Sequence, residues 1–380
     1  MQITGDWIKD QDLQAVLYCL TSAGHQALLV GGCVRNGLLG VAIDDIDIAT
    51  DAPPKTVIAL AKAAGLRVVP TGIDHGTVTV IAGGKPHEVT TFRRDVETDG
   101  RRAVVAFSDR IDEDAMRRDL TMNALYADAS GLIIDPLGGL PDLLARRVRF
   151  VGKPEDRIRE DYLRILRFFR FHARYGDQAL GFDAEGLAAC AAHSAGIETL
   201  SRERVGHEML KLLAAPDPSP AIAAMQATGV LAQVLTGADS RALAHLVHFE
   251  SGLAPDAIRR LSVLGGASAA PALRLSRDQA RRLEVLRDGI GAMTGALELA
   301  YRHGADAARD ILLARGAIFG QPLASDWQAD IAKGATAVFP VRAADLAPTL
   351  SGPALGRKLK ELESRWITSG FKLSREQLIA

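Results

Sequence analysis

The stretch LLVGGCVRNGLLGVAIDDIDIAT, residues 28–50, decides the fold of the first part of this chain. Its apolar run ends at two glycines, a short helical segment follows, and DIDIAT then alternates as a strand does. Because residues two apart on a strand project from the same face, the carboxylates of Asp45 and Asp47 should point together. Two such anions repel each other, and Mg²⁺, which prefers oxygen ligands, relieves the repulsion. The stretch therefore predicts a strand, a helix and a second strand that presents a magnesium site at Asp45 and Asp47.

The turn between the first strand and the helix suits a phosphate group. Gly31 and Gly32 let the backbone approach a triphosphate, and Arg35 adds a charged clamp in the first helical turn. Two metal ions about 4 Å apart can activate an attacking hydroxyl and stabilise a leaving pyrophosphate, so the pattern indicates nucleotidyl transfer. Alone, the aspartate pair is more often a solvated strand end and the glycine pair a plain tight turn. Their combination with Arg35 in one short segment favours function.

Outside this stretch, the pattern of residues along the chain changes once. LRVVPTG and GTVTVIAGG are β-branched runs ended by glycine, and PPKTVIALAKAAG is a helical pattern between strands. From about Pro154 onward the sequence is arginine-rich and alanine-rich with helical periodicity, interrupted by joints near residues 214–220, 251–255 and 320–322. The sequence predicts strands and helices in the first 150 residues and almost only helices after them.

Composition narrows the class of protein. The 380 residues are 48% hydrophobic and 24% charged with a formal net charge of −1, so the chain can form cores and is no uniformly basic nucleic-acid coat. Its length predicts more than one domain. The 3 cysteines form no CxxC pair, which disfavours a disulfide framework and favours a reducing cytoplasm. No segment is apolar for long enough to span a membrane, so we expect an unexported protein away from membranes.

Two further motifs carry arginines beside carboxylates. RRDLTMNAL places Arg118 and Asp119 just before a predicted helix that includes Asn123, a set suited to sugar hydroxyls and phosphate. In DYLRILRFFR, one predicted helix face carries Asp161, Arg164, Arg167 and Arg170 at intervals of three. A carboxylate and a guanidinium one turn apart can pair with the edge of a base.

Plainer interpretations of these motifs stay open. Asp119 can simply cap a helix, and Asp161 can form an ordinary ion pair with Arg164. Residues 146–174 contain ten Lys or Arg side chains against four Asp or Glu, which can be a solvated face. The apolar residues of the same segment, among them Phe168, Phe169 and Phe171, instead favour arginines that line a cleft.

Together the motifs resemble the class II tRNA nucleotidyltransferase and bacterial poly(A) polymerase family of the DNA polymerase β-like nucleotidyltransferase superfamily. The resemblance covers residues 28–213 and extends in family order through TGIDHGTVTV, HEVTTFRRD, MRRDLTMNALYAD, IDPLGGLPDLLARRVRFVG, REDYLRILRFFRFHARYG and SRERVGHEMLKLL. Asn36 departs from the pattern, because the family has aspartate there. The loss of that charge puts the orientation of Arg35 in question.

The resemblance implies an α+β fold, with an N-terminal head of mixed β-sheet and helices followed by an all-α neck, body and tail. It implies a catalytic nucleotidyltransferase head at 1–150, a nucleotide-selecting neck at 151–215 and a tRNA-binding body and tail at 216–380. Asp45 and Asp47 would be the catalytic metal ligands for Mg²⁺. The nucleotide-binding residues carried over from the family are Gly32, Arg35, Arg118, Asp119, Asn123, Asp161, Arg164, Arg167 and Arg170.

The activity implied is template-independent addition or repair of the 3′-terminal CCA of tRNA from CTP and ATP, with release of pyrophosphate. The partners implied are the tRNA 3′ end, CTP and ATP, for a monomer or a homodimer. A poly(A) polymerase shares every catalytic motif and is the first alternative. A catalytically silent RNA-binding protein on the same fold is the second, which the retained Asp45 and Asp47 disfavour.

Weaker signals complete the picture. Glu88, on a predicted strand, is a candidate third acidic group near the metals or a partner of Arg93 or Arg94. His75 is more typical of a turn than of a catalytic base. The polar segment 95–109 resembles the flexible loop that the family uses when it switches from C to A addition, which favours a full CCA enzyme. In the C-terminal helix, the cations at 357, 358 and 360 suit tRNA phosphates or a solvated face.

Overall fold

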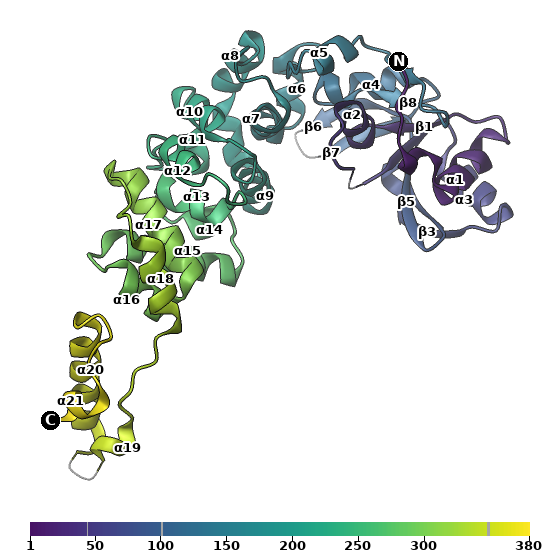
Figure 1. Ribbon diagram of the computed structural model, residues 1–380. Helices are drawn as coiled ribbons and strands as arrows, with labels where there is room; N and C mark the ends of the chain where they lie inside the picture. Colours follow the sequence, from purple (N-terminus) through teal and green to yellow (C-terminus); the bar gives the residue numbers. More distant parts are fainter. Residues whose placement is uncertain (44, 100–101, 348–349) are drawn as a thin grey trace. The chain divides into compact units, whose positions relative to one another are not determined.

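A computed structural model describes residues 1–43, 45–99, 102–347 and 350–380 of the chain (Figure 1). The chain divides into two compact units, Met1–Thr236 and Gly237–Ala380, and each is described by itself. This division is coarser than the head, neck and body expected from sequence, and those boundaries stay a prediction. Within the described ranges, no helix is both long and apolar enough to cross a membrane.

The strands belong to the first unit and form a mixed sheet and a separate hairpin. In the described residues the sheet has seven strands in the order β3-β4-β5-β2-β1-β8-β9, in which β2 and β5 are parallel and the other neighbours antiparallel. The strands are β1 (Ala27–Val30), β2 (Asp47–Thr50), β3 (Arg67–Gly72), β4 (Thr77–Ala82), β5 (Lys85–Thr91), β8 (Tyr126–Ala127) and β9 (Ile133–Ile134), with β6 (Arg93–Asp99) and β7 (Arg102–Phe107) forming the hairpin.

Helices precede, cover and follow this sheet in the first unit. They are η1 (Asp6–Lys9), α1 (Gln11–Thr21), α2 (Gly32–Leu39), α3 (Pro54–Ala63), η2 (Ile73–His75), α4 (Ile111–Met116), η3 (Thr121–Asn123), α5 (Leu140–Leu144), α6 (Pro154–Glu160), α7 (Leu163–Tyr175), α8 (Ala184–Ala192), η4 (Ser194–Thr199), α9 (Arg202–Leu213), α10 (Ser219–Ala227) and α11 (Val230–Val234).

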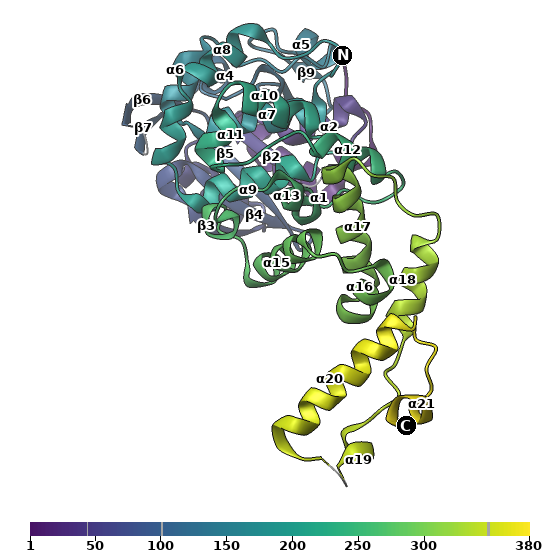
Figure 2. The ribbon, with the colours of Figure 1, turned by 90° about the vertical axis from the view of Figure 1, so that its left-hand side faces the viewer.

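The described part of the second unit contains helices and no strand, as Figure 2 shows for several of them. They are α12 (Leu243–Phe249), α13 (Ala257–Leu264), α14 (Ala269–Ala272), α15 (Arg277–Gly291), α16 (Ala296–His303), α17 (Ala305–Phe319), α18 (Trp327–Thr336), α19 (Ala343–Leu346), α20 (Gly352–Thr368) and α21 (Arg375–Ile379). The expected α+β class, with a mixed sheet first and helices after it, is therefore confirmed.

Local structure corrects three expectations and adds a hairpin where a flexible loop was expected, a prediction that stays untested. Strand β2 begins at Asp47, so Asp45 precedes the strand instead of lying on it. Asn123 ends the three-residue 3₁₀ turn η3 and lies on no α-helix. Asp161 adopts extended backbone between α6 and α7, so it does not share a regular helix face with Arg164. The polar segment 95–109 contributes to the β6–β7 hairpin, although residues 100 and 101 lie outside the described residues.

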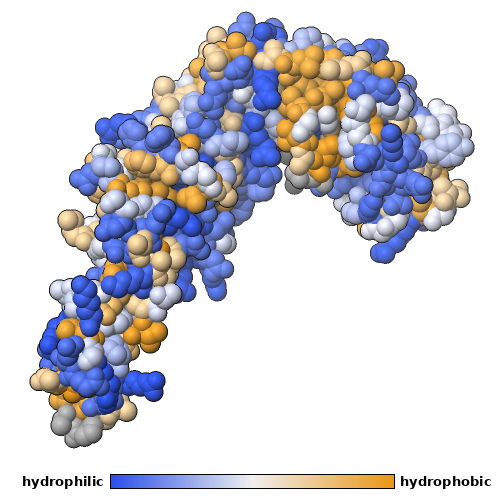
Figure 3. Space-filling model, in the orientation of Figure 1, coloured by the Kyte–Doolittle hydropathy of each residue, from blue (hydrophilic) through white to orange (hydrophobic). Residues whose placement is uncertain are grey.

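The sheet is fixed by apolar residues on both of its faces. All four residues of β1 are buried, and helices α1 and α3 pack side by side against the sheet (Figure 1). On one face, Leu28 and Val30 join Phe92 and Tyr126 in a single buried cluster. Helix α2 buries Cys33 and Val34, whereas Figure 3 shows a hydrophobic area at the surface where α2 lies. Burial at about 25 cal/mol per Å² is what holds the first strand and its turn in place.

Helix α7 is fixed by an aromatic cluster that the sequence suggested. Phe168 stacks on Phe150 at 5.1 Å between ring centroids and contacts Phe169 edge-on at 5.6 Å. His172 lies on the same side, stacked on Phe182 at 3.7 Å. Helix α7 also packs on α9 and α10. One side of α7 is thus a core surface, and its arginines are left to the other side.

The second unit contains a buried ionic cluster. Arg259 donates to Glu250 at 2.5 Å and to Asp310 at 3.1 Å, and Arg260 donates to Glu250 at 2.8 Å. Arg282 reaches the second oxygen of Asp310 at 2.7 Å, and Asp310 itself is fully buried. The cluster joins the segments of α12, α13, α15 and α17, and each charge in it depends on its partners because burial removes water.

Removing one charge from this cluster should destabilise the chain strongly. We expect Asp310→Asn to lower the free energy of unfolding by about 3–5 kcal/mol, because it leaves buried guanidinium groups uncompensated. The matched control is Asp306→Asn on the same helix, an 87% exposed carboxylate that also pairs with Arg309, for which a loss within about 1 kcal/mol is expected. Urea unfolding followed by circular dichroism measures both, and equal losses would contradict the assignment.

Acid should destabilise the first unit through His172. Burial lowers the pKa of His172 from 6.5 to about 4, so the folded state excludes a proton that the unfolded state binds. The resulting stability is complete above pH 6.5 and is lost as the pH falls toward 4. Between pH 7 and pH 5 the loss should be about 2 kcal/mol. Unfolding of His172→Gln at both pH values should show a smaller pH dependence, whereas His207→Gln, at an exposed position of α9, should keep the full dependence.

Candidate active site

Two carboxylates of the predicted metal site lie at the start of β2. Asp47 is its first residue and is in register with Val30 on β1 and Glu88 on β5, while Asp45 lies two residues before it. Desolvation of the carboxylate, followed by the negative charge of Glu88, raises the pKa of Asp47. Asp45 adds to this repulsion and the guanidinium of Arg118 opposes it. Glu88 therefore lies beside Asp47. This position fits the interpretation of Glu88 as a third acidic group near the metal site.

The turn before α2 has the geometry that its glycines allow. Gly31 has φ 72° and ψ −118°, a backbone conformation that side chains disfavour, and it forms the N-cap of α2. A Cβ added there would lie 3.5 Å from Nη1 of Arg118. The turn therefore brings a helix N-terminus next to a cation, and Asp47 begins the strand that pairs with β1.

Arg35 is buried and donates four hydrogen bonds to three residues. Its Nε and Nη2 donate to Oδ1 of Asn36 at 3.1 and 2.9 Å, and Nη1 donates to Oδ1 of Asn123 at 2.5 Å. Nη2 also donates to the hydroxyl of Tyr175 at 2.9 Å, whose ring lies 4.2 Å from the guanidinium carbon. The amide of Asn36 donates in turn to the carbonyl of Ala42 at 2.7 Å. Asn36 therefore orients Arg35 without the charge of the family aspartate.

The hydrogen bonds continue from Asn123 to helix α7. Asn123 donates to Oδ1 of Asp119 at 2.9 Å, and Nε of Arg167 donates to Oδ2 of Asp119 at 2.6 Å. Burial alone would raise the pKa of Asp119, but Arg167 and the amide of Asn123 hold it below the usual value. One turn further along α7, Nε of Arg170 lies 2.6 Å from the carboxylate of Glu208 on α9. Sequence reasoning missed Glu208, although it lies in the quoted motif SRERVGHEMLKLL.

Arg118 belongs to a second cluster around a buried aspartate. It donates to Asp114 at 2.9 Å and to the hydroxyl of Tyr126 at 3.1 Å, and Tyr126 donates to Asp114 at 2.7 Å. Asp114 and Tyr126 were not singled out in the sequence. The sequence did not indicate that Asp114, one of several acidic residues in a short helix, is buried. Its burial depends on ion pairs with Arg117 and Arg118 that only the folded chain brings together.

Asp161 and Arg164, the pair predicted to recognise a base, do not contact each other through their side chains. Oδ2 of Asp161 accepts from Arg204 at 2.6 Å and Oδ1 accepts from the backbone of Leu163 at 3.1 Å. The guanidinium of Arg164 donates to Glu160 at 2.5 Å and to the carbonyl of Arg117 at 2.9 Å. An ion pair between Asp161 and Arg164, the plainer interpretation, is thus not what the structure has. Their role in base recognition stays a prediction.

A pocket of about 350 Å³ joins the strand end to the helices. Five predicted residues line it, namely Gly32, Arg35, Asp45, Asp47 and Arg170. The other lining residues are Asn36, Arg174, Tyr175, Lys211 and Ala214. The remaining predicted residues lie outside this lining, and four of them belong to the side-chain clusters behind it: Arg118, Asp119, Asn123 and Arg167. Arg174 could have been predicted as a site residue. It follows Arg170 by one helical turn and therefore lies on the same face of α7.

The donor set fits a hard divalent cation. Asp45 and Asp47 face one pocket, and Glu88 is the strand neighbour of Asp47. The pKa of Asp47 is raised first by desolvation and then by the negative charges of Glu88 and Asp45, and a cation would compensate these charges. Within the described ranges, which omit residue 44, no group of three or more acidic, histidine or cysteine side chains is close enough to hold a metal. Protein ligands would therefore be few, which suits ions that also bind substrate phosphates.

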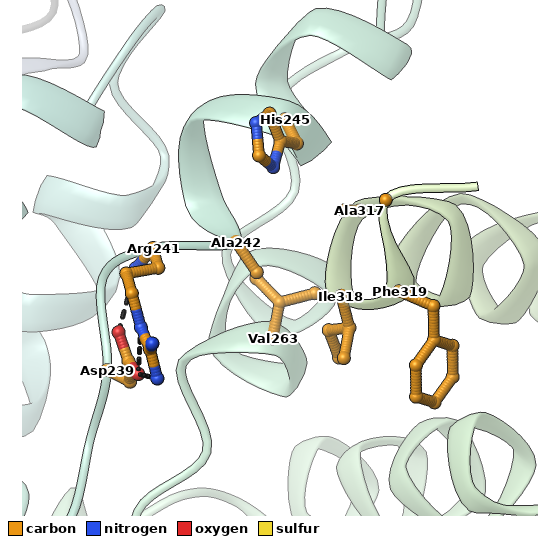
Figure 4. A pocket seen from close by; sticks show the side chains of 9 residues that line it. Asp239, Arg241, Ala242, His245, Val263, Ala317, Ile318 and Phe319 are labelled. Carbon is orange, nitrogen blue, oxygen red and sulfur yellow. Dashed lines mark hydrogen bonds and ion pairs between the residues drawn. The ribbon is translucent and has the colours of Figure 1, made fainter. Parts of the chain in front are cut away.

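A second pocket, of about 480 Å³, lies in the C-terminal unit and contains no predicted site residue. Figure 4 shows Asp239 and Arg241 paired with each other on the segment before α12, with Ile318 and Phe319 at the end of α17 on the other side. His245 of α12 also lines it. The cation of this pocket is thus already compensated, and the lining is otherwise mostly apolar.

Comparison with known proteins identifies relatives of the chain. The family described as "Poly A polymerase head domain" matches residues 27–149, and "Probable RNA and SrmB- binding site of polymerase A" matches residues 181–241. The human mitochondrial CCA tRNA nucleotidyltransferase 1 is 40% identical over 204 residues, which are 53% of this chain and 47% of that protein. The CCA-adding enzyme of Streptococcus pyogenes serotype M2 is 45% identical over 214 residues, 55% of this chain and 51% of that enzyme. The chain spans about half the length of the curated relatives it matches.

Solved structures extend the likeness in fold to nearly the whole chain. The Bacillus stearothermophilus CCA-adding enzyme in complex with CTP has a TM-score of 0.73 and 28% identity, covering 94% of this chain and 93% of that one. The Thermotoga maritima CCA-adding enzyme complexed with tRNA has a TM-score of 0.72 over 99% and 95%, at 18% identity, which concerns fold alone. The resemblance derived from the sequence motifs is confirmed.

Replacement of Asn36 should show how far Arg35 depends on it. We expect Asn36→Ala to lower the free energy of unfolding by about 1–3 kcal/mol, because two buried donors of Arg35 lose their acceptor. Asn36→Asp keeps that acceptor and exchanges only the amide that binds Ala42, so its loss should be smaller. Urea unfolding of the two variants measures the difference. An alanine variant as stable as the unchanged chain would show that Arg35 is held without Asn36.

Proposed function

We propose that this chain, a relative of the class II CCA-adding enzymes, adds or repairs the 3′-terminal CCA of tRNA from CTP and ATP. The observation that carries the proposal is the pocket that brings Asp45 and Asp47 together with the Gly32 turn and the cationic end of α7. Carboxylates and cations in one pocket suit a metal-bound triphosphate and an RNA end. Names of the relatives in sequence and in fold point the same way.

Asp45 and Asp47 are the proposed catalytic carboxylates. Proteins of this family generally use divalent metal ions, and we propose Mg²⁺ because the ligands are carboxylate oxygens. Such ions would lower the pKa of the attacking hydroxyl and compensate the charge on the leaving pyrophosphate. Asp45 and Asp47 would hold such ions beside the reacting phosphate, and the N-terminus of α2 after the glycine turn would offer that phosphate backbone N–H groups. In the reaction the terminal ribose oxygen bonds to the α-phosphorus, the bond to the bridging oxygen breaks, and pyrophosphate leaves.

Arg170 in the pocket lining and four residues behind the pocket complete the proposed nucleotide-binding set. Asp119 and Asn123 would meet the ribose hydroxyls, and Arg118, Arg167 and Arg170 would hold base or phosphates. These side chains are already fixed by carboxylates and amides, so binding would cost little loss of side-chain freedom.

Asp161 and Arg164 are the proposed readers of the base. The carboxylate of Asp161 would accept the exocyclic amine of C or A, and Arg164 would donate to a ring nitrogen. For Asp161 this requires that its bond with Arg204, which is partly exposed, be exchanged for the base.

The rest of the chain has proposed roles of coarser kind. Residues 1–150 would act as catalytic head, 151–215 as nucleotide-selecting neck, and 216–380 as tRNA-binding body and tail. We propose a cytoplasmic location, which the three buried free cysteines support. A poly(A) polymerase remains the runner-up, and the matched family descriptions that mention it are the reason to test for it.

An extension assay tests the function. A tRNA transcript lacking CCA, incubated with Mg²⁺, CTP and ATP, should gain C, C and A, as read by sequencing the products. Asp45→Ala and Asp47→Ala should each lower the rate by at least about a hundredfold, because a metal ligand is lost. Asp6→Ala, at an exposed aspartate of η1, should not change it.

Three results would decide against the proposal. Long runs of A would assign a poly(A) polymerase. Binding of the transcript without extension would assign a silent RNA-binding protein. Full activity of Asp45→Ala would remove the carboxylate pair from the mechanism.

A further inference from the structure

The basic wall of the site pocket contains two kinds of cation. Arg170 lines the pocket but lies 2.6 Å from the carboxylate of Glu208, so its charge is compensated inside the protein. Arg174 and Lys211 line the same pocket and are exposed. Among the described residues, no carboxylate lies within ion-pair distance of either one, and the guanidinium carbon of Arg174 lies 5.8 Å from the centroid of the Tyr175 ring. These two positive charges are therefore available to a ligand.

Two different helices bring these cations to one place. Arg174 lies in the last turn of α7 and Lys211 in the last turn of α9, and the two helices pack against each other. Ala214, the residue after α9, also lines the pocket, and its small side chain leaves room beside Lys211. A cation in a last helical turn also stabilises its own helix, which is the plain structural reason for such residues. Stabilisation of helix ends does not explain why both cations line the pocket that contains Asp45 and Asp47.

We propose that Arg174 and Lys211 bind a backbone phosphate of the RNA end whose terminal hydroxyl attacks. This inference rests on the proposed function, in which the carboxylates and the glycine turn take the metal-bound triphosphate. The same pocket then carries two uncompensated positive charges for a second polyanion, and that polyanion is the RNA strand. Lys211 also falls in residues 181–241, the segment matched by the family described as an RNA-binding site. Holding the phosphate next to the terminal ribose fixes where the hydroxyl lies.

Steady-state kinetics of the full chain tests the pair. In Arg174→Gln and Lys211→Gln, the KM for a tRNA transcript lacking CCA should rise about tenfold each, since one phosphate contact is worth roughly that factor. The KM for CTP and the kcat at saturating RNA should change less than twofold. The double variant should also reduce the slope of log KM for RNA against log salt concentration. Lys62→Gln is the matched control, because Lys62 lies in the last turn of α3 and not in the pocket.

The outcomes separate the inference from the proposed function. If KM for CTP rises while KM for RNA stays, the pair serves the nucleotide and the inference is overturned. If the double variant behaves as Lys62→Gln does, the cations only stabilise helix ends, which also overturns it. If the unchanged chain extends no RNA, the proposed function fails. Fluorescence anisotropy with the same transcript then still measures how Arg174→Gln and Lys211→Gln change the affinity for RNA. A loss of RNA affinity in both variants would then support it, and equal affinity would overturn it.

Discussion

The hydrogen bonds around Arg35 are the constraint on which the site depends. Through Asn36 and Asn123 the guanidinium joins the helix that follows the glycine turn to the 3₁₀ turn η3, and Asp119 extends the connection to Arg167 on α7. A buried guanidinium must have its donors satisfied, so this network admits few alternative arrangements. The position of α7 relative to the strand end, and with it the width of the pocket, follows from that requirement.

The same network explains why polar residues of the sequence motifs are mostly not in the pocket. The prediction that Asp119 and Asn123 touch a nucleotide stays untested, and in the structure their side chains bond to Arg35, to Arg167 and to each other. Residues that fix an active-site arginine and residues that bind substrate have the same chemical character. Sequence alone therefore separates them poorly, because the difference lies in which partner is nearer in space.

The fold was predictable to the extent that local patterns determine it. Glycine turns, β-branched runs and helical periodicity predicted the strands around residues 28–50 and the helical remainder, because these signals act within a few residues. Asp45, η3 and Asp161 were misplaced by one to a few residues, since hydrogen bonds to distant segments decide where an element begins or ends. Glu208, Asp114 and Lys211 could not be assigned, because their partners or their pocket lie far away in sequence.

Most of the positive charges in the basic segment 146–174 are paired with carboxylates in the folded chain. Seven of its ten cations, at positions 147, 149, 157, 159, 164, 167 and 170, lie within 4.0 Å of a carboxylate among the described residues. Several of those carboxylates come from outside the segment, such as Asp119, Asp142 and Glu208. The apparent excess is therefore mostly internal structure. Within the segment, the cations for which no such partner is found among the described residues are those at positions 146, 153 and 174, and of these three Arg174 lines the site pocket. An arrangement of this kind attracts an RNA end locally without making the whole surface attractive to nucleic acid, which agrees with a net charge of −1.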